Sequence, residues 1–188
     1  MAFLISKLEQ RILETLLYNL DKKLSIHQIA NLLKTSYSHV YNKTRELLKE
    51  KLLIKETIGN STILYLNLKN DLLRNAICHI ELLRRNRWLK SHASIKEFFE
   101  KTESYQIDSV FFYANKIMIC IDNFFVQTML SDFLNSHFKE LHKKVVFLSK
   151  KEVIPYLKPV IVAKKIAICN PDWYYKQLSD FMNHDKFK

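Results

Sequence analysis

The sequence predicts an α+β protein in which a helical N-terminal segment precedes a small domain of mixed helices and strands. Up to about residue 51, apolar side chains recur at helical spacing, and two alternating runs then flank the only glycine, Gly59. From residue 107, short continuous apolar runs typical of buried strands are interleaved with helical patterns. The predicted segments are residues 1–68, connecting helices over residues 69–105, and a small α/β domain over residues 106–188.

The chain has a net charge of +11, because 30 Lys and Arg residues outnumber 19 Asp and Glu residues. Each of the three predicted segments has a positive balance, so the charge does not come from a basic tail. Hydrophobic residues make up 48% of the sequence, enough for a globular core. A basic globular protein of this kind favours a polyanionic partner.

No segment is predicted to enter a membrane or the secretory pathway. The apolar start of the chain is interrupted at Lys7, Glu9 and Arg11, before it reaches the length of a signal-peptide core. No apolar run approaches the roughly 20 residues of a membrane span. The three cysteines are widely separated, in a spacing that fits neither a disulfide framework nor a zinc site. We therefore expect a cytoplasmic protein with reduced thiols and no metal or other cofactor.

Three short amphipathic helices are predicted in the N-terminal segment. Their apolar positions are Leu8, Ile12, Leu16 and Leu20 in the first helix, and Ile26, Ile29, Ala30 and Leu33 in the second. Ser25 and Ser36 are the predicted N-caps of the second and third helices. The third helix is expected to end near Lys51.

The third predicted helix has an apolar side and a polar side. Its apolar stripe consists of Val40, Thr44, Leu47 and Leu48, with Tyr37 at the edge. Because successive residues are rotated by about 100°, the opposite side presents Ser38, Asn42, Arg45 and Lys49, flanked by His39, Tyr41 and Glu46. Asn pairs bidentately with adenine and Arg with guanine, while Ser, Tyr and Lys bond bases or phosphates. The alternative is a helix surface that is only solvated.

A β-hairpin is predicted directly after this helix. Residues 53–58 and 62–68 read as strands, and Gly59-Asn60 between them suits a type II′ turn, since Gly takes the positive φ of the first turn position. Lys55 and the amides around Asn60 are expected to reach a nucleic-acid backbone or minor groove. The candidate DNA-binding residues are Ser36, Ser38, His39, Tyr41, Asn42, Lys43, Arg45, Lys55 and Asn60.

Residues 25–68 resemble the winged helix-turn-helix domain of prokaryotic, archaeal-type transcription regulators. The resemblance is carried by Ile26, Ile29, Ala30, Leu32 and Leu33, then by Ser36, Ser38 and Val40, and then by the run from Leu47 to Ile54. The sequence departs from the usual form at Leu52, where such domains commonly have Gly before the first strand of the wing. The resemblance implies that this segment binds double-stranded DNA.

A long connecting helix is predicted after the hairpin. It has a broad apolar stripe of Leu72, Leu73, Ala76, Ile77, Ile80, Leu82 and Leu83, and ends in Arg84-Arg85-Asn86-Arg87-Trp88. Two interpretations of the stripe remain open: a homodimer contact, or packing on the chain's own second domain. Residues 95–105 read as a further helix with Ile95, Phe98 and Phe99 turned inward.

The C-terminal segment is predicted to contain short strands separated by helices. Strands are expected at residues 110–113, 117–121, 144–148 and 166–169, and helices at residues 126–139, at 150–157 and from Pro171. Ser149 is expected to cap the helix over residues 150–157, and Pro159 to close it.

This order resembles a minimal nucleotidyltransferase-type domain of the kind fused to winged helices in archaeal regulators. The closest match is the segment Ile-Ala-Ile-Cys-Asn-Pro-Asp-Trp-Tyr-Tyr near the C-terminus. Active members have Gly-Ser after the first strand and an Asp-x-Asp pair on the next strand that holds two magnesium ions. Here Ala114-Asn115 follows the first strand, and only Asp122 ends the second. We therefore expect a degenerate domain without catalytic residues.

Other catalytic patterns are also missing from the sequence. The seven histidines form no His-x-x-x-His pair, and one glycine cannot make a Gly-rich phosphate loop. Aromatic residues near the C-terminus are expected in the core rather than in a ligand pocket: Tyr113, Tyr156, Trp173, Tyr174 and Tyr175. We expect a DNA-binding transcription regulator whose C-terminal domain assembles, senses a small effector or contacts transcription machinery. The alternatives are an enzyme acting on nucleotides or RNA, and a protein–protein interaction module.

Overall fold

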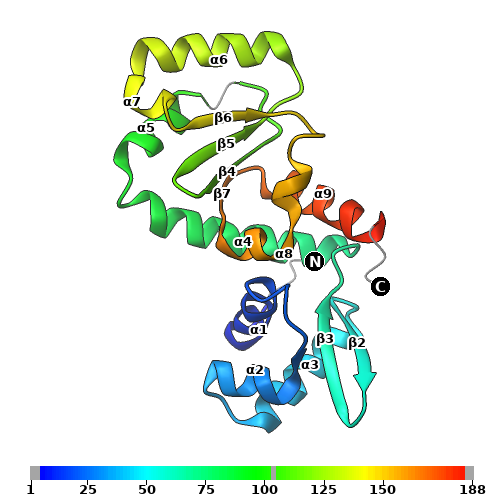
Figure 1. The fold of residues 1–188 in the computed structure, drawn as a ribbon. Coiled ribbons are helices and arrows are strands. Elements are labelled where there is room, and N and C mark those ends of the chain that lie inside the picture. The colour runs from blue at the N-terminus through cyan, green and yellow to red at the C-terminus, as the bar shows by residue number, and fades with distance from the viewer. Residues whose placement is uncertain (1–4, 103–104, 185–188) are drawn as a thin grey trace. The chain divides into compact units, whose positions relative to one another are not determined.

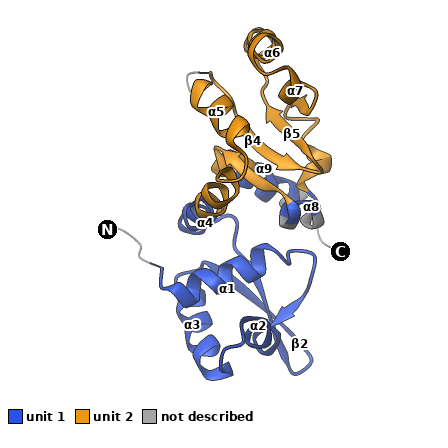
Figure 2. Ribbon diagram, turned by 90° about the vertical axis from the view of Figure 1, so that its left-hand side faces the viewer, with its two compact units in different colours: residues 1–80, 158–164, 175–188 blue, residues 81–157, 165–174 orange. Residues whose placement is uncertain are grey.

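The computed structural model describes residues 5–102 and 105–184, which form a mixed α+β structure with two sheets, as the sequence predicts (Figure 1). The chain divides into two compact units (Figure 2). The first unit contains residues 1–80, 158–164 and 175–188, and the second contains residues 81–157 and 165–174. Each unit combines stretches that are far apart in the sequence, whereas the three predicted segments are continuous stretches of the chain.

The three predicted N-terminal helices are present in the first unit: α1 (Lys7–Leu17), α2 (Ile26–Leu33) and α3 (Tyr37–Lys49). The predicted N-cap at Ser25 is confirmed, because its hydroxyl accepts from the Gln28 amide at 3.3 Å and the Gln28 side chain accepts from the Ser25 amide at 2.8 Å. The predicted capping bond at Ser36 is wrong. Ser36 occupies the N-cap position of α3, but its side chain makes no capping hydrogen bond.

The predicted hairpin is also present, formed by β2 (Leu53–Ile58) and β3 (Ser61–Leu66). With β1 (Leu24–Ser25) they make an antiparallel sheet in the order β1-β3-β2. Ile58 pairs with Ser61, so Gly59 and Asn60 form a two-residue loop. Gly59 has a φ of 57° whereas Asn60 is not among the positive-φ residues, which is the pattern of a type II′ turn.

Lysines adopt the left-handed conformation at the ends of two helices of this glycine-poor chain. Lys34 has a φ of 50° after α2, and Lys51 has a φ of 56° after α3. The Leu52 amide donates to the Leu47 carbonyl at 2.9 Å and the Lys51 amide to the Leu48 carbonyl at 3.1 Å, as in a Schellman motif. The residue that takes the position favoured by glycine is therefore Lys51 rather than Leu52.

Two asparagine side chains hold the strained end of α3. The Asn67 and Asn70 side-chain amides donate to the Lys51 carbonyl at 2.8 and 3.1 Å. The Asn70 carbonyl oxygen in turn accepts from the Leu72 amide at 2.8 Å, at the start of α4 (Asp71–Leu89). The end of α3, the hairpin and the start of α4 are thus tied together by side-chain hydrogen bonds within the first unit.

Proline begins a helix where we expected it to end one. Pro159 is the first residue of α8 (Pro159–Lys164), where the missing amide hydrogen costs nothing. The predicted helix over residues 150–157 is reduced to a short 3₁₀ segment, η1 (Ile154–Leu157). Ser149 still accepts from the Glu152 amide, at 3.4 Å. The predicted start of the last helix at Pro171 is confirmed by α9 (Pro171–His184).

The second unit is built on a four-stranded sheet of order β6-β5-β4-β7. Its strands are β4 (Ser109–Tyr113), β5 (Lys116–Cys120), β6 (Val145–Leu148) and β7 (Ile166–Cys169). β6 runs parallel to β5, and the other pairs are antiparallel. The second unit also contains α5 (Ala93–Lys101), α6 (Phe124–His137) and α7 (Lys139–His142), with η1, the end of α4 and the start of α9.

Side chains on both faces of this sheet are buried, which explains its continuous apolar runs. On one face, residues of α5, α6 and α7 join strand residues in a single apolar cluster: Ile95, Phe98, Val110, Ile117, Ile119, Leu130, Leu134, Leu141 and Ile168. On the other face, the Phe111 ring lies 5.2 Å from that of Tyr174, edge to face. Of the five aromatic residues expected in the core, Tyr174 and, in the first unit, Tyr175 are fully buried, whereas Tyr113, Tyr156 and Trp173 are only partly buried.

A buried ion pair joins α4 to the strand β7 region of the second unit. Lys165 Nζ lies 3.5 Å from Glu81 Oε1, and both side chains have no exposed surface. The Ala167 amide donates to Glu81 Oε2 at 3.4 Å, and the Lys165 ammonium lies 4.4 Å from the centre of the Tyr174 ring. Burial raises the pKa of Tyr174, whose hydroxyl donates to the Tyr156 carbonyl at 2.6 Å. Removal of either charge would remove the attraction that offsets the cost of burying the other.

Replacing Glu81 with Ala should therefore lower the free energy of unfolding of the second unit by about 3–5 kcal/mol. Trp88 and Trp173 both belong to this unit, so tryptophan fluorescence during urea unfolding measures its stability. Glu97, in an exposed pair with Lys101 at 2.6 Å, is the control, and Glu97→Ala should cost at most about 1 kcal/mol. Equal losses in the two variants would show that the buried pair has no special role.

Candidate nucleic-acid interface

One side of α3 is held in the core of the first unit. Val40, Thr44 and Leu47 have at most 1% of their surface exposed. The Thr44 hydroxyl donates to the Tyr41 carbonyl at 2.8 Å, so burial does not leave it without a hydrogen bond. The predicted inner face of the helix is confirmed at these three positions, and the polar side must therefore face outward.

The outward positions of α3 carry most of the predicted contact residues. Exposed side chains on or next to this helix are Ser36, Ser38, His39, Tyr41, Asn42, Arg45 and Lys49. They lie mainly in the first turns, and helix starts commonly enter the major groove in helix-turn-helix proteins. The surface therefore offers hydroxyl, amide and guanidinium groups within a few turns of one helix.

Lys43 differs from the other predicted residues because its charge is already paired. Its Nζ lies 2.6 Å from Glu46 Oε2 and 3.6 Å from Glu9 Oε1 of α1. The hydrogen bond to Glu46 raises the pKa of Lys43. Burial alone would raise the pKa of Glu9, but hydrogen bonds from Ser6 lower it. Lys43 thus ties α3 to α1, and its carboxylate neighbours weaken its attraction for phosphate.

A second contact orients α2, which precedes α3 by a three-residue turn. The Arg11 guanidinium of α1 donates to the Leu33 carbonyl at 2.7 Å, at the last residue of α2. A cation at the C-terminal end of a helix also interacts favourably with the helix dipole. Arg11 and Lys43 therefore attach both helices of the pair to α1 through charged groups.

The hairpin supplies the remaining predicted residues. Lys55 in β2 and Asn60 in the turn are both exposed. The neighbouring Glu56 carboxylate accepts a hydrogen bond from the Tyr65 hydroxyl of β3 at 2.8 Å. Lys55 has no carboxylate within ion-pair distance among the described residues, so its charge is available to an anionic partner.

Two residues next to this surface were missed by the sequence analysis. Tyr37 is half exposed, although its spacing from Val40 placed it at the edge of the apolar stripe. His27 of α2 is also exposed, and its ring lies 6.3 Å from the Tyr37 ring. The sequence contains no signal for this pairing, because it depends on how α2 and α3 cross.

The turn of the second unit that replaces the expected Gly-Ser is a two-residue hairpin loop. Ala114 and Asn115 have φ values of 50° and 62°, and Tyr113 pairs with Lys116 on either side of them. Asp122, after β5, accepts from the Lys150 amide at 2.9 Å and lies 3.4 Å from the Lys150 ammonium. Asp108 lines the same cavity of about 290 Å³ as Asp122. The two acids are thus near each other, and one of them is neutralised by a lysine.

The chemistry of Cys120 does not suit nucleophilic catalysis. Burial, with smaller contributions from Asp108 and Asp122, raises the pKa of its thiol to about 12. A thiol with this pKa stays protonated at neutral pH, and the thiolate is the reactive form. Within residues 5–102 and 105–184, moreover, no three His, Cys, Asp or Glu side chains are grouped as metal ligands.

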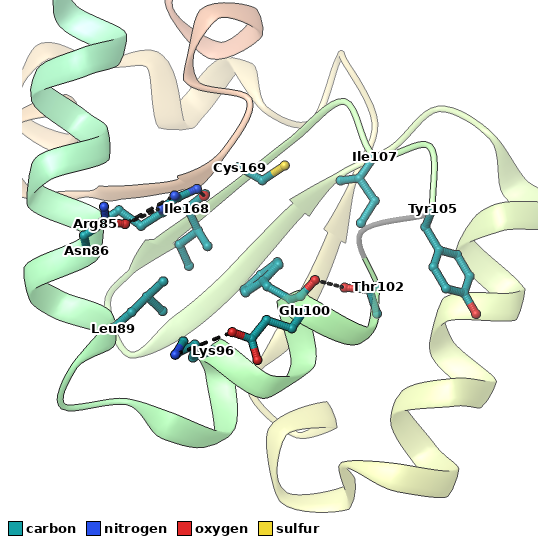
Figure 3. A pocket seen from close by; sticks show the side chains of 11 residues that line it. Arg85, Asn86, Leu89, Lys96, Glu100, Thr102, Tyr105, Ile107, Ile168 and Cys169 are labelled. Carbon is teal, nitrogen blue, oxygen red and sulfur yellow. Dashed lines mark hydrogen bonds and ion pairs between the residues drawn. The ribbon is translucent and has the colours of Figure 1, made fainter.

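A cavity of about 310 Å³ lies between α4, α5 and β7 in the second unit (Figure 3). Its walls are mostly apolar, from Leu89, Phe99, Ile107 and Ile168, with Arg85 and Asn86 at one side. The Arg85 guanidinium donates to the Ile168 carbonyl at 3.0 Å. None of the five aromatic residues considered for a pocket from the sequence lines this cavity.

Among the helices of the described residues, none has both the length and the apolar composition that a bilayer-spanning segment requires.

The comparisons with known proteins leave the family of the chain open. The chain matches no protein-family model, and neither a curated protein nor a solved structure is significantly similar to it.

Proposed function

We propose that residues 1–68 form a winged helix-turn-helix domain that binds double-stranded DNA in a sequence-specific manner. The observation that carries the proposal is the exposed polar side of α3, which is held outward by burial of Val40, Thr44 and Leu47 and is followed by a hairpin with an exposed Lys55. The net charge of +11 supports a polyanionic partner. In this docking α3 enters the major groove, and the hairpin contacts the backbone or minor groove.

In this docking, some side chains contact base edges, and others contact phosphates and so position the protein on the duplex. Asn42 and Arg45 have the bidentate groups that pair with adenine and guanine edges. Ser36, Ser38, His39 and Lys55 carry donors suited to phosphate oxygens, which set the register of the domain without reading sequence. Lys43, held by two carboxylates, contributes mainly to the attachment of α3.

We propose further that the protein is a cytoplasmic homodimeric transcription regulator. Leu72, Leu82 and Leu83 of α4 are 44%, 38% and 39% exposed, and in the proposed dimer a second copy covers them. Two copies related by a twofold axis would present two α3 helices to a pseudo-palindromic site. The cavity beside Arg85 is suited in size to a small effector, so the C-terminal domain would serve assembly or sensing.

The first prediction concerns the contacts of α3 and the hairpin. After selection of a preferred duplex from random sequences, Asn42→Ala or Arg45→Ala should weaken binding to it by about 1–3 kcal/mol, because a base edge loses its bidentate partner. Lys55→Ala should weaken binding to all duplexes alike and reduce the salt dependence by about one phosphate contact. Fluorescence anisotropy titrations at several salt concentrations measure both effects.

Lys116, an exposed lysine of β5 in the second unit, is the matched control. Lys116→Ala removes the same charge as Lys55→Ala and should leave binding nearly unchanged. Wild-type affinity in the Asn42→Ala/Arg45→Ala double variant would contradict this docking.

The second prediction is a dimer of about twice the chain mass of 22.5 kDa. Light scattering coupled to size exclusion should give this mass at micromolar concentration. Placing carboxylates on the exposed leucines of α4, in Leu82→Asp/Leu83→Asp, should produce monomers, because a dimer would bury unpaired charges. Leu32 of α2, 58% exposed, is the control, and Leu32→Asp should remain dimeric. A wild-type monomer with and without DNA would reject the dimer.

The third prediction is that the C-terminal domain does not transfer nucleotides. Phosphoryl transfer needs positioned metal ions that neutralise phosphate charge, and Asp122 is already bound by Lys150. Incubation with labelled nucleoside triphosphates and magnesium or manganese, with the protein, DNA or RNA as acceptor, should give no labelled product. Metal-dependent labelling that disappears in Asp122→Ala or Asp108→Ala would establish an enzyme instead.

A further inference from the structure

Four side chains form a continuous row along the exposed side of α3 and the adjoining α2. The His27 ring lies 6.3 Å from the Tyr37 ring, and the Tyr37 and Tyr41 rings are stacked at 5.8 Å with an angle of 23° between their planes. The Arg45 guanidinium carbon lies 5.9 Å from the centre of the Tyr41 ring. We call the two tyrosines with their flanking His27 and Arg45 the tyrosine ladder.

The tyrosines of the ladder are stacked on each other and remain exposed. Tyr37 and Tyr41 are one helical turn apart, which brings their rings to a stacked arrangement. His27 and Arg45 lie beside the outer members of the row. The rings are nevertheless 50% and 40% exposed. Unpaired bases are the other partner on which exposed aromatic rings stack.

The exposed tyrosine rings place apolar surface in the middle of a polar face. Apolar surface in water is unfavourable, and its removal from water contributes binding free energy. In the major groove of B-DNA, the apolar group that distinguishes one base from the others is the C5 methyl of thymine. The major-groove edges of the other bases present mainly hydrogen-bond donors and acceptors, and phosphates are charged. The chemistry of the ladder therefore matches a groove lined with methyl groups.

We propose that the tyrosine ladder reads C5-methyl groups of pyrimidines in the major groove, so that the preferred DNA is rich in thymine along the path of α3. The inference rests on the proposed function, since it assigns the specificity of the same helix. Asn42, next to Tyr41 in the sequence, supports it: an amide that pairs with adenine and an aromatic ring that covers a thymine methyl select the same base pair. Arg45, beside Tyr41, then contacts a neighbouring guanine or phosphate.

The test compares duplexes that differ only in the methyl group. Binding of the full chain is measured at fixed salt to an alternating dA–dT duplex and to the same duplex with deoxyuridine in place of thymidine. The wild type should bind the thymidine duplex more tightly, by about four-fold for each methyl group that the ladder covers. An alternating dG–dC duplex should likewise be bound more tightly when its cytosines carry a 5-methyl group.

Variants of the ladder distinguish direct contact of the tyrosines with methyl groups from an effect of methylation on duplex shape. Tyr37→Ala/Tyr41→Ala should lose the discrimination while keeping charge-driven binding to both duplexes. Tyr37→Phe/Tyr41→Phe retains the aromatic rings and should retain the discrimination. Leu32→Ala removes an exposed apolar side chain from α2 and should also retain it. Circular dichroism verifies that each variant is folded.

Equal wild-type binding to the thymidine and deoxyuridine duplexes would overturn the inference and leave duplex binding intact. Discrimination that persists in Tyr37→Ala/Tyr41→Ala would overturn it as well, because duplex shape would then be its cause. Tighter binding to single-stranded than to duplex DNA, lost in the same variant, would show that the ladder stacks on bases. Absence of binding to any duplex would reject the proposed function itself.

Discussion

The constraint on which the candidate interface depends is the burial of one side of α3. Val40, Thr44 and Leu47 are almost completely removed from solvent, so rotation of the helix would expose them and bury Asn42 or Arg45. Contacts to α1 reinforce this orientation. Lys43 is paired with Glu9, and Arg11 binds the end of α2. The packing of the buried side of α3 therefore determines which of its polar side chains face a partner.

The scarcity of glycine makes the local geometry depend on side-chain hydrogen bonds. The one glycine, Gly59, lies at the hairpin turn, where its φ is 57°. At the end of α3, Lys51 takes the left-handed conformation instead, which is strained for a residue with a Cβ atom. Asn67 and Asn70 hold its carbonyl and so secure the step from α3 into β2. The angle between the helix and the hairpin thus rests on two asparagines.

Features decided within a few residues could be predicted from the sequence. The three N-terminal helices, the Ser25 cap, the hairpin at Gly59 and the strands of the second unit follow from local periodicity and turn chemistry. Pro159 was interpreted wrongly, because proline is tolerated both after a helix and at its first position. The predicted capping hydrogen bond of Ser36 is absent, because a serine at the N-cap position makes such a bond possible but does not ensure that it forms.

Features that join distant residues could not be predicted. Glu81 and Lys165 are 84 positions apart, and no pattern in either segment indicates a buried pair. The membership of residues 175–184 in the same compact unit as α1–α3 likewise depends on packing. At the candidate interface, the outward set followed from helical geometry, but the contact of His27 with Tyr37 required the crossing of α2 and α3.

The central claim is that α3 and the β2–β3 hairpin form the surface that binds duplex DNA. A titration of the ¹⁵N-labelled full chain with unlabelled duplex, followed by amide chemical shifts, tests it most directly. The largest shifts should occur in residues 36–49 and 53–66, and residues 106–184 should change little. Shifts concentrated in residues 106–184, or an unchanged α3 at saturating duplex, would contradict it.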